Sequence, residues 1–144
     1  MKQEPRLGRA LKSTGHVVDR HVNTLIAEKT GENLSPVQGR VLGFLHWNAD
    51  RDIYQRDVEA EFGITRSTVA SILKLMEQRG YIRREAVPGD ARLKKLSLTP
   101  LGEEVFQKID ASLRQMEEDL KAALAPQEYT LLLELLEKLK QKFQ

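Results

Sequence analysis

Cysteine is missing from the 144-residue sequence. Its absence excludes a disulfide framework, a thiol redox switch and any metal site that depends on thiolate ligands. A glycine-rich phosphate loop, an HExxH motif and a G-x-S-x-G motif are missing too, and the three histidines form no acid–base constellation. His16 and His21 are five residues apart, which is about 140° around a helix, and so share no face for a metal ion. We therefore expect no enzyme, no metal and no cofactor.

Long apolar runs are absent as well. No segment approaches the roughly 18 apolar residues that a membrane helix needs, and Met1–Arg6 lacks the apolar core of a secretory signal. We therefore expect a cytoplasmic protein that contacts no membrane. A chain of 144 residues with 40% hydrophobic and 31% charged residues is long enough for one domain with one sizeable core.

The net charge of +2 hides an uneven distribution along the chain. Residues 66–95 include eight basic and three acidic residues, a local charge of +5, so the rest of the chain carries −3. A basic centre between acidic ends is the distribution that a phosphate-facing surface requires. Surface lysines and arginines that are merely solvated are the alternative for charge taken alone.

Apolar spacing predicts helices on both sides of this basic segment. Ser35-Pro36 and Thr99-Pro100 each place an N-cap residue before a proline at the first helical position. Gly63 and Gly80 stand where left-handed residues end helices, and Thr65 is a further N-cap candidate. The predicted helices cover residues 6–29, 36–48, 54–62, 66–79, 100–125 and 127–143.

The pattern changes after Gly80 to short runs that suit β-strands. These runs, Tyr81–Val87 and Leu93–Leu98, are separated by Pro88–Arg92, whose proline and glycine favour a turn. The segment is therefore predicted to be a β-hairpin.

Residues 54–79 have the order of a helix-turn-helix, because a turn containing Gly63 separates a short helix from a capped one. The apolar residues of the second helix share one face, and the opposite face is polar. No carboxylate occurs from Arg66 to Met76, whereas a merely solvated helix usually mixes both signs. We expect this face to enter a major groove, with an ordinary amphipathic surface helix as the alternative. The outward residues are Ser67, Ser71, Lys74 and Gln78.

The hairpin that follows is expected to act as a wing. Its tip, Pro88–Arg92, would carry Arg92 into a narrow minor groove, and Asp90 could hold the guanidinium with a salt bridge. A solvated turn with a weak charge pair is the alternative. Helix and hairpin together give the candidate DNA contacts Arg66, Ser67, Thr68, Ser71, Lys74, Asp90, Arg92 and Lys94.

The chain resembles the MarR family of transcription regulators. Residues 90–102 fit the family pattern D-x-R followed by L-x-L-T-x-x-G, and residues 55–59, 64–69 and 75–82 resemble the helix-turn-helix and the lead into the wing. The resemblance implies a mainly α fold with a small β-hairpin, in which a winged helix-turn-helix is embedded between long N- and C-terminal dimerisation helices. It implies a single domain over 1–144, with residues 1–30 and 100–144 for dimerisation and 35–99 for DNA binding.

A MarR-like protein is expected to be a homodimer that represses transcription from a palindromic operator in double-stranded DNA. Many members release DNA when a small aromatic molecule binds, and Phe44, His46 and Trp47 could line such a pocket, although aromatic residues there also suit a core. The alternative function is a winged helix that binds protein. Such a surface would expose aromatic or aliphatic anchors, which the outward face of the second helix lacks.

Overall fold

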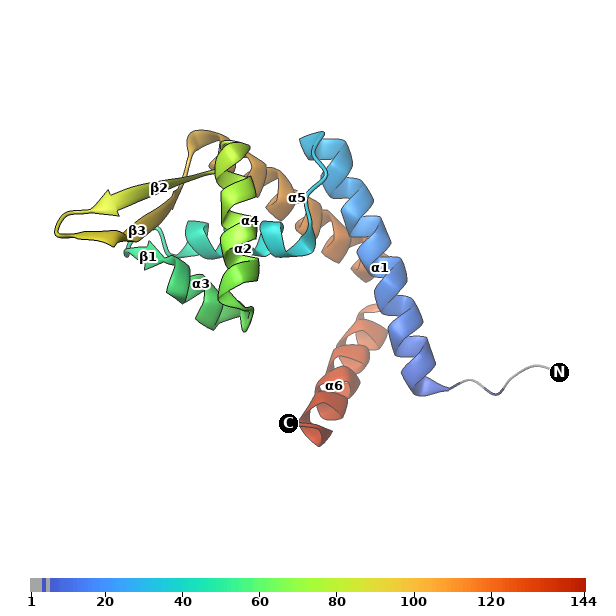
Figure 1. The fold of residues 1–144 in the computed structure, drawn as a ribbon. Helices are drawn as coiled ribbons and strands as arrows, with labels where there is room; N and C mark the ends of the chain where they lie inside the picture. Colours follow the sequence, from blue (N-terminus) through green and yellow to red (C-terminus); the bar gives the residue numbers. More distant parts are fainter. Residues whose placement is uncertain (1–3, 5) are drawn as a thin grey trace. The chain divides into compact units, whose positions relative to one another are not determined.

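A computed structural model describes residue 4 and residues 6–144 of the chain. The fold is mainly helical with one small antiparallel sheet, which confirms the predicted fold class (Figure 1). The elements are α1 (Leu7–Thr30), α2 (Pro36–Trp47), β1 (Ile53–Tyr54), α3 (Gln55–Phe62), α4 (Arg66–Gln78), β2 (Ile82–Val87), β3 (Asp90–Leu98), α5 (Pro100–Ala122) and α6 (Pro126–Lys142).

The chain forms two compact units. The central unit comprises residues 26–110, and the terminal unit combines residues up to 25 with residues 111–144. Helices α1 and α5 each contribute to both units. The central unit contains the whole of residues 35–99, the segment in which the sequence places the winged helix-turn-helix.

Two predicted helix starts in the central unit are confirmed by their caps. Ser35 forms a capping box with Gln38, in which the Ser35 hydroxyl accepts the Gln38 N–H at 3.2 Å and the Gln38 side chain accepts the Ser35 N–H at 3.0 Å. Thr65 caps α4 by accepting the N–H of Thr68 at 3.4 Å. Side-chain oxygens at these positions satisfy backbone donors that the helix itself cannot pair.

The sheet has three strands in the order β1-β3-β2. Strand β1 pairs with β3, so that Ile53 lies opposite Leu96 and Tyr54 opposite Lys95. The sequence predicts only β2 and β3, and it starts the short helix at Tyr54 instead of Gln55. Two residues are too few to show the alternation by which a strand is recognised, which explains why β1 was missed.

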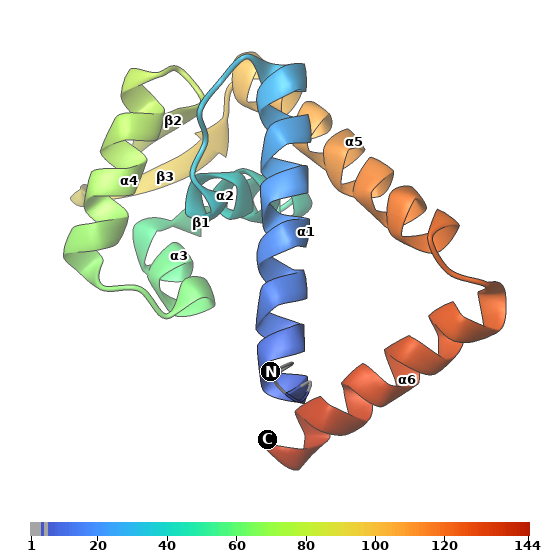
Figure 2. The ribbon, with the colours of Figure 1, turned by 90° about the vertical axis from the view of Figure 1, so that its right-hand side faces the viewer.

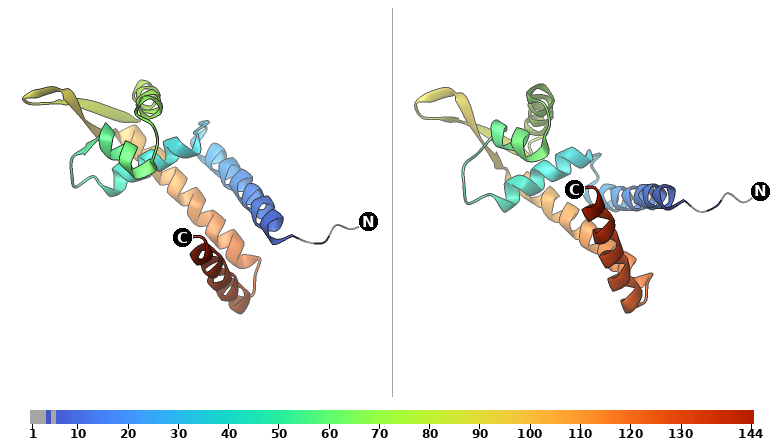
Figure 3. Two further views of the ribbon diagram at one scale, coloured as in Figure 1. Left: turned by 60° about the horizontal axis from the view of Figure 1, so that its bottom comes forward. Right: turned by 90° about the horizontal axis from the view of Figure 1, so that it is seen from below.

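The turn of the hairpin is tighter than predicted. Pro88 and Gly89 alone form it, and β3 already begins at Asp90. Gly89 has φ 87°, which a residue without a side chain adopts at little cost. The hairpin extends beyond the helices of the central unit (Figures 1 and 3).

The hydrophobic core lies in the central unit, around the buried face of α4. Val69, Leu73 and Met76 are almost completely buried, and Ile72 packs against them at the margin. This confirms the apolar face that the sequence predicts for the helix. The other buried residues of the cluster are Val41, Leu42, Leu45, Ile53, Val58, Tyr81, Ile82, Leu96, Val105, Phe106 and Ile109.

The turn from β3 into α5 packs against the start of β2. The Thr99 hydroxyl accepts the Gly102 N–H at 2.9 Å and donates to the Gly80 carbonyl, while the Thr99 N–H donates to the Tyr81 carbonyl at 3.1 Å. A Cβ on Gly102 would overlap the Tyr81 carbonyl oxygen. The T-x-x-G part of the family pattern therefore has a packing role here, because it needs a capping hydroxyl and a residue without a side chain.

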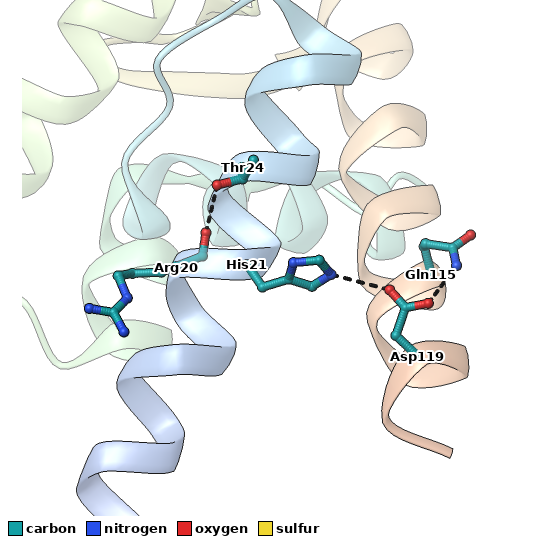
Figure 4. Close-up of polar contacts among 5 residues, drawn as sticks. All are labelled: Arg20, His21, Thr24, Gln115 and Asp119. Carbon is teal, nitrogen blue, oxygen red and sulfur yellow. Dashed lines mark hydrogen bonds and ion pairs between the residues drawn. The ribbon is translucent and has the colours of Figure 1, made fainter. Parts of the chain in front are cut away.

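The terminal unit contains a polar link between α1 and α5. His21 Nε2 lies 3.2 Å from Asp119 Oδ2, and Gln115 donates to the other oxygen of Asp119 at 2.9 Å (Figure 4). These contacts, Gln115 first and His21 second, lower the pKa of Asp119. On α1 itself the Thr24 hydroxyl donates to the Arg20 carbonyl at 3.0 Å.

Within the described part of the chain, no helix is long and apolar enough to cross a membrane. Among the same residues, no three or more His, Cys, Asp or Glu side chains are grouped so that they could hold a metal ion.

We expect Gly102→Ala to lower the free energy of unfolding by about 1–3 kcal/mol, because the added methyl group forces α5 away from the Tyr81 carbonyl. Urea denaturation monitored by circular dichroism measures this change. Gly39→Ala in α2 is the control, since its Cβ would lie 3.8 Å from Ile109, an ordinary contact. This control should be neutral or stabilise the protein by about 0.5–1 kcal/mol. Wild-type stability in Gly102→Ala would contradict the packing role.

Candidate nucleic-acid interface

Helices α3 and α4 form the predicted helix-turn-helix. Gly63 ends α3 with φ 59°, and three residues separate the two helices, which run in clearly different directions (Figure 2). The Gln55 side chain of α3 donates to the Arg66 carbonyl at the start of α4, at 3.3 Å. This contact ties the first turns of the two helices together.

The face of α4 opposite the core is exposed and polar. Ser67, Ser71, Lys74 and Gln78 all lie on the surface, and the Ser71 hydroxyl donates to the Ser67 carbonyl at 3.1 Å. Arg66 and Thr68 in the first turn are exposed too. The short side chains leave the helix backbone accessible, so that a ligand surface could approach it closely.

Arg92 lies in an irregular part of the hairpin. Ala86 on β2 pairs with Lys94, but the next residue, Val87, pairs with Asp90. Residues 91–93 therefore interrupt the regular register as a bulge with Arg92 at its middle. Such bulges turn a side chain away from the direction that regular pairing would give it.

Asp90 stabilises this bulge in a different way from the one predicted. Its carboxylate accepts the backbone N–H of Arg92 at 3.0 Å, in place of the expected salt bridge to the guanidinium. An Asp side chain readily accepts the N–H two residues later, and this local contact needs no long side chain to be held in place. No ion pair to the Arg92 guanidinium occurs within the described residues.

A hollow with a volume of about 540 Å³ lies between α3, the start of α4 and the three strands of the sheet. We call it the basic hollow. It brings together three predicted contacts, Arg66, Arg92 and Lys94, and adds Arg56 and Arg84. Ser67, Thr68, Ser71, Lys74 and Asp90 do not line it. The remaining lining residues, as far as the structure describes them, are Tyr54, Gln55, Glu59, Leu93 and Leu96.

The sequence does not indicate Arg56 as a contact, because the residue lies outside the basic segment 66–95. The folding of the chain places α3, and Arg56 with it, beside the basic residues of the hollow. Its guanidinium lies over the Tyr54 ring, 5.2 Å from the ring centroid, an arrangement that favours a cation. The ring restricts the side chain while its N–H groups remain available for an acceptor.

An ion pair joins α4 to the hairpin. Arg84 on β2 donates from Nε and Nη2 to the two carboxylate oxygens of Glu77, both at 3.1 Å, and its side chain is only 23% exposed. Bidentate pairs of this kind fix direction as well as distance. The hydrogen bonds from Arg84 lower the pKa of Glu77. The pair therefore sets the angle at which the hairpin leaves α4.

The three aromatic candidates for effector binding have different surroundings. Phe44 packs edge-on against Phe62, with ring centroids 5.9 Å apart, beside the core. His46 stacks on Phe106 at 4.1 Å and forms a 2.7 Å contact from Nδ1 to Glu103, which lowers the pKa of that carboxyl group. Trp47 is 70% exposed. Of the three, Trp47 projects furthest into solvent.

Comparison with known proteins finds a matching family model and similar transcription regulators. The MarR family model matches residues 32–93. The HTH-type transcriptional regulator BilQ of Clostridioides difficile is 27% identical over 105 residues, which are 73% of this chain and 71% of that protein.

Two solved structures of MepR have the same fold. MepR is described as a transcription regulator of the Staphylococcus aureus multidrug efflux pump MepA. The two sequences are 20% identical, and the match covers 97% of this chain and 100% of the MepR chain with a TM-score of 0.82. A MepR mutant from S. aureus bound to an oligodeoxyribonucleotide is 22% identical and covers 98% and 100%, with a TM-score of 0.70. These descriptions are those of regulators and not of enzymes.

Proposed function

We propose that this chain, whose residues 32–93 match the MarR family model, is a winged helix-turn-helix regulator of that family and represses transcription by binding a palindromic operator as a homodimer. Helix α4 enters the major groove, and the hairpin carries Arg92 into the adjacent minor groove. The observation that carries this proposal is the exposed face of α4, free of carboxylates, beside a hairpin whose Arg92 is left without an ion pair in the described residues. The related MepR mutant solved with an oligodeoxyribonucleotide supports DNA as the partner.

The residue chemistry of α4 suits a major groove about 12 Å wide. Hydroxyl groups of Ser67, Thr68 and Ser71 can donate to or accept from base edges and phosphates, and Lys74 reaches a phosphate. Arg66 is at the first position of the helix, where unpaired backbone N–H groups also favour an anion. On the hairpin, Asp90 holds the backbone of the bulge, and Lys94 assists Arg92 at the DNA backbone.

The terminal unit supplies the dimer interface in this proposal. Helices α1 and α6, in their described residues, have no buried side chain, and both expose large apolar residues. Contiguous exposed apolar surface of this kind marks a protein interface, and a second copy related by a two-fold axis buries the same surface on both chains. The exposed apolar residues of this unit are Leu7, Leu11 and Val17 on α1, Leu113 and Leu120 on α5, and Leu131, Leu132, Leu133 and Leu135 on α6, with Phe143 following it.

A small aromatic effector is the proposed signal that releases DNA. Trp47 favours this class of ligand, because most of its ring is exposed and other aromatic rings lie beside it. Its ring is edge-on to His46 and to Phe106, with centroid distances of 4.9 Å and 6.2 Å. Phe44 is partly buried and packs against the core and the Phe62 ring. Aromatic ligands favour such stacked and edge-on neighbours.

Arg92→Ala should weaken operator binding by more than roughly 30-fold at physiological salt, because each groove contact contributes about 1–3 kcal/mol and the homodimer loses two of them. A gel-shift titration measures it, and circular dichroism should show an unchanged fold. Arg83→Ala is the matched control. Arg83 is next to Arg84 on β2, and adjacent residues on a strand point to opposite faces, so Arg83 does not line the basic hollow as Arg84 does. Unchanged affinity in Arg92→Ala would reject the role of the hairpin as a wing.

Leu132→Asp should convert the dimer to monomer at micromolar concentration, because the interface would bury an unpaired carboxylate. Sedimentation velocity distinguishes the two states. Thr130→Asp adds the same charge about 160° away around α6 and should leave the dimer intact. A Leu132→Asp protein that sediments as the wild-type dimer would show that α6 does not form the interface.

Titration with small phenols should change the fluorescence of Trp47, the single tryptophan of the sequence, over the same concentration range that releases DNA. Fluorescence and gel-shift titrations with one compound give both midpoints. Release of DNA without any change in Trp47 fluorescence would place the effector elsewhere.

A further inference from the structure

We propose that the basic hollow seats the sugar–phosphate backbone that separates the two grooves, and that Arg56 is one of its phosphate contacts. This inference rests on the proposed function. If α4 occupies a major groove and Arg92 the adjacent minor groove, one DNA strand has to pass between the helix and the hairpin. The basic hollow lies in this space, since its lining comes from α3, the start of α4, β2 and β3.

The charges of the lining identify a phosphodiester as the ligand. Five cationic side chains face a common space with Glu59 as their acidic neighbour. Like charges held together repel each other, and a concave surface concentrates their field. A bound anion relieves this repulsion. Phosphates of a DNA strand provide one negative charge per nucleotide, in a row that a hollow open to solvent can accept.

The cations of the hollow differ in how much they are already engaged. Arg84 is held by both oxygens of Glu77, so it mainly positions the hairpin. The Arg56 guanidinium lies over the face of the Tyr54 ring, and within the described residues it forms no ion pair; a guanidinium stacked on a ring can still donate two N–H groups to one phosphate. Arg56 is therefore the side chain that the geometry adds to the predicted contacts.

The walls of the hollow are tied to one another, which makes it a preformed site. The Gln55 side chain on α3 donates a hydrogen bond to the Arg66 carbonyl on α4. Strand β1 pairs with β3, and this pairing places Tyr54 opposite Lys95. The pair between Glu77 and Arg84 joins α4 to β2. A site whose walls are fixed loses less conformational entropy when it binds a ligand.

Arg56→Gln in the full-length protein tests the assignment through the salt dependence of DNA binding. Because the homodimer loses one phosphate contact in each half-site, the slope of log affinity against log salt should become shallower by about 1.8. Affinity should fall roughly 3- to 10-fold, to the same extent for operator and unrelated duplexes, because a phosphate contact carries no sequence information. Arg51→Gln is the matched control, since Arg51 is an exposed arginine of the central unit that does not line the hollow.

Duplexes with a neutral methylphosphonate at single positions locate the contact. One or two positions in each half-site should weaken the wild type and Arg51→Gln, yet have no further effect on Arg56→Gln. Failure of the wild type to bind any duplex would overturn the proposed function itself. Wild-type binding with an unchanged slope in Arg56→Gln, or an equal loss of slope in Arg51→Gln, would overturn this inference alone. A loss confined to the operator sequence would also overturn it, because it would indicate a base contact.

Discussion

Burial of Val69, Leu73 and Met76 fixes the rotation of α4 about its own axis. Rotation by a single residue position, about 100°, would bring Lys74 toward the core and carry apolar side chains into water. Burying an ammonium group without a partner costs far more than the helix could recover by other contacts. The polar face that we assign to DNA therefore depends on an apolar contact made on the opposite side of the same helix.

The hairpin is oriented by two separate contacts. The bidentate pair between Glu77 and Arg84 sets its angle to α4, and the close packing of Gly102 on the Tyr81 carbonyl fixes where β2 begins. The family pattern thus has two halves with different physical roles. Its D-x-R half shapes the bulge that presents Arg92, whereas its T-x-x-G half holds the hairpin to α5.

Most of the fold could be predicted from the sequence because its signals are local. The caps Ser35 and Thr65 and the left-handed Gly63 each act within one helical turn, so their residue types are sufficient evidence. The strand β1 was missed because it exists only through pairing with β3. The predicted salt bridge of Asp90 was wrong because the nearer backbone N–H competes for the same carboxylate.

The candidate site was predictable only in part for a related reason. Arg66, Arg92 and Lys94 lie in the basic segment and stay predicted contacts, whereas Arg56 joins them through the turn between α3 and α4 and the pairing of β1. Selection of bound duplexes from a random DNA pool by the purified full-length protein tests the central claim most directly. The account predicts an enriched inverted repeat with half-site centres about 34 Å, or roughly 10 bp, apart. A pool without any enriched sequence, or enrichment of a single site without two-fold symmetry, would contradict it.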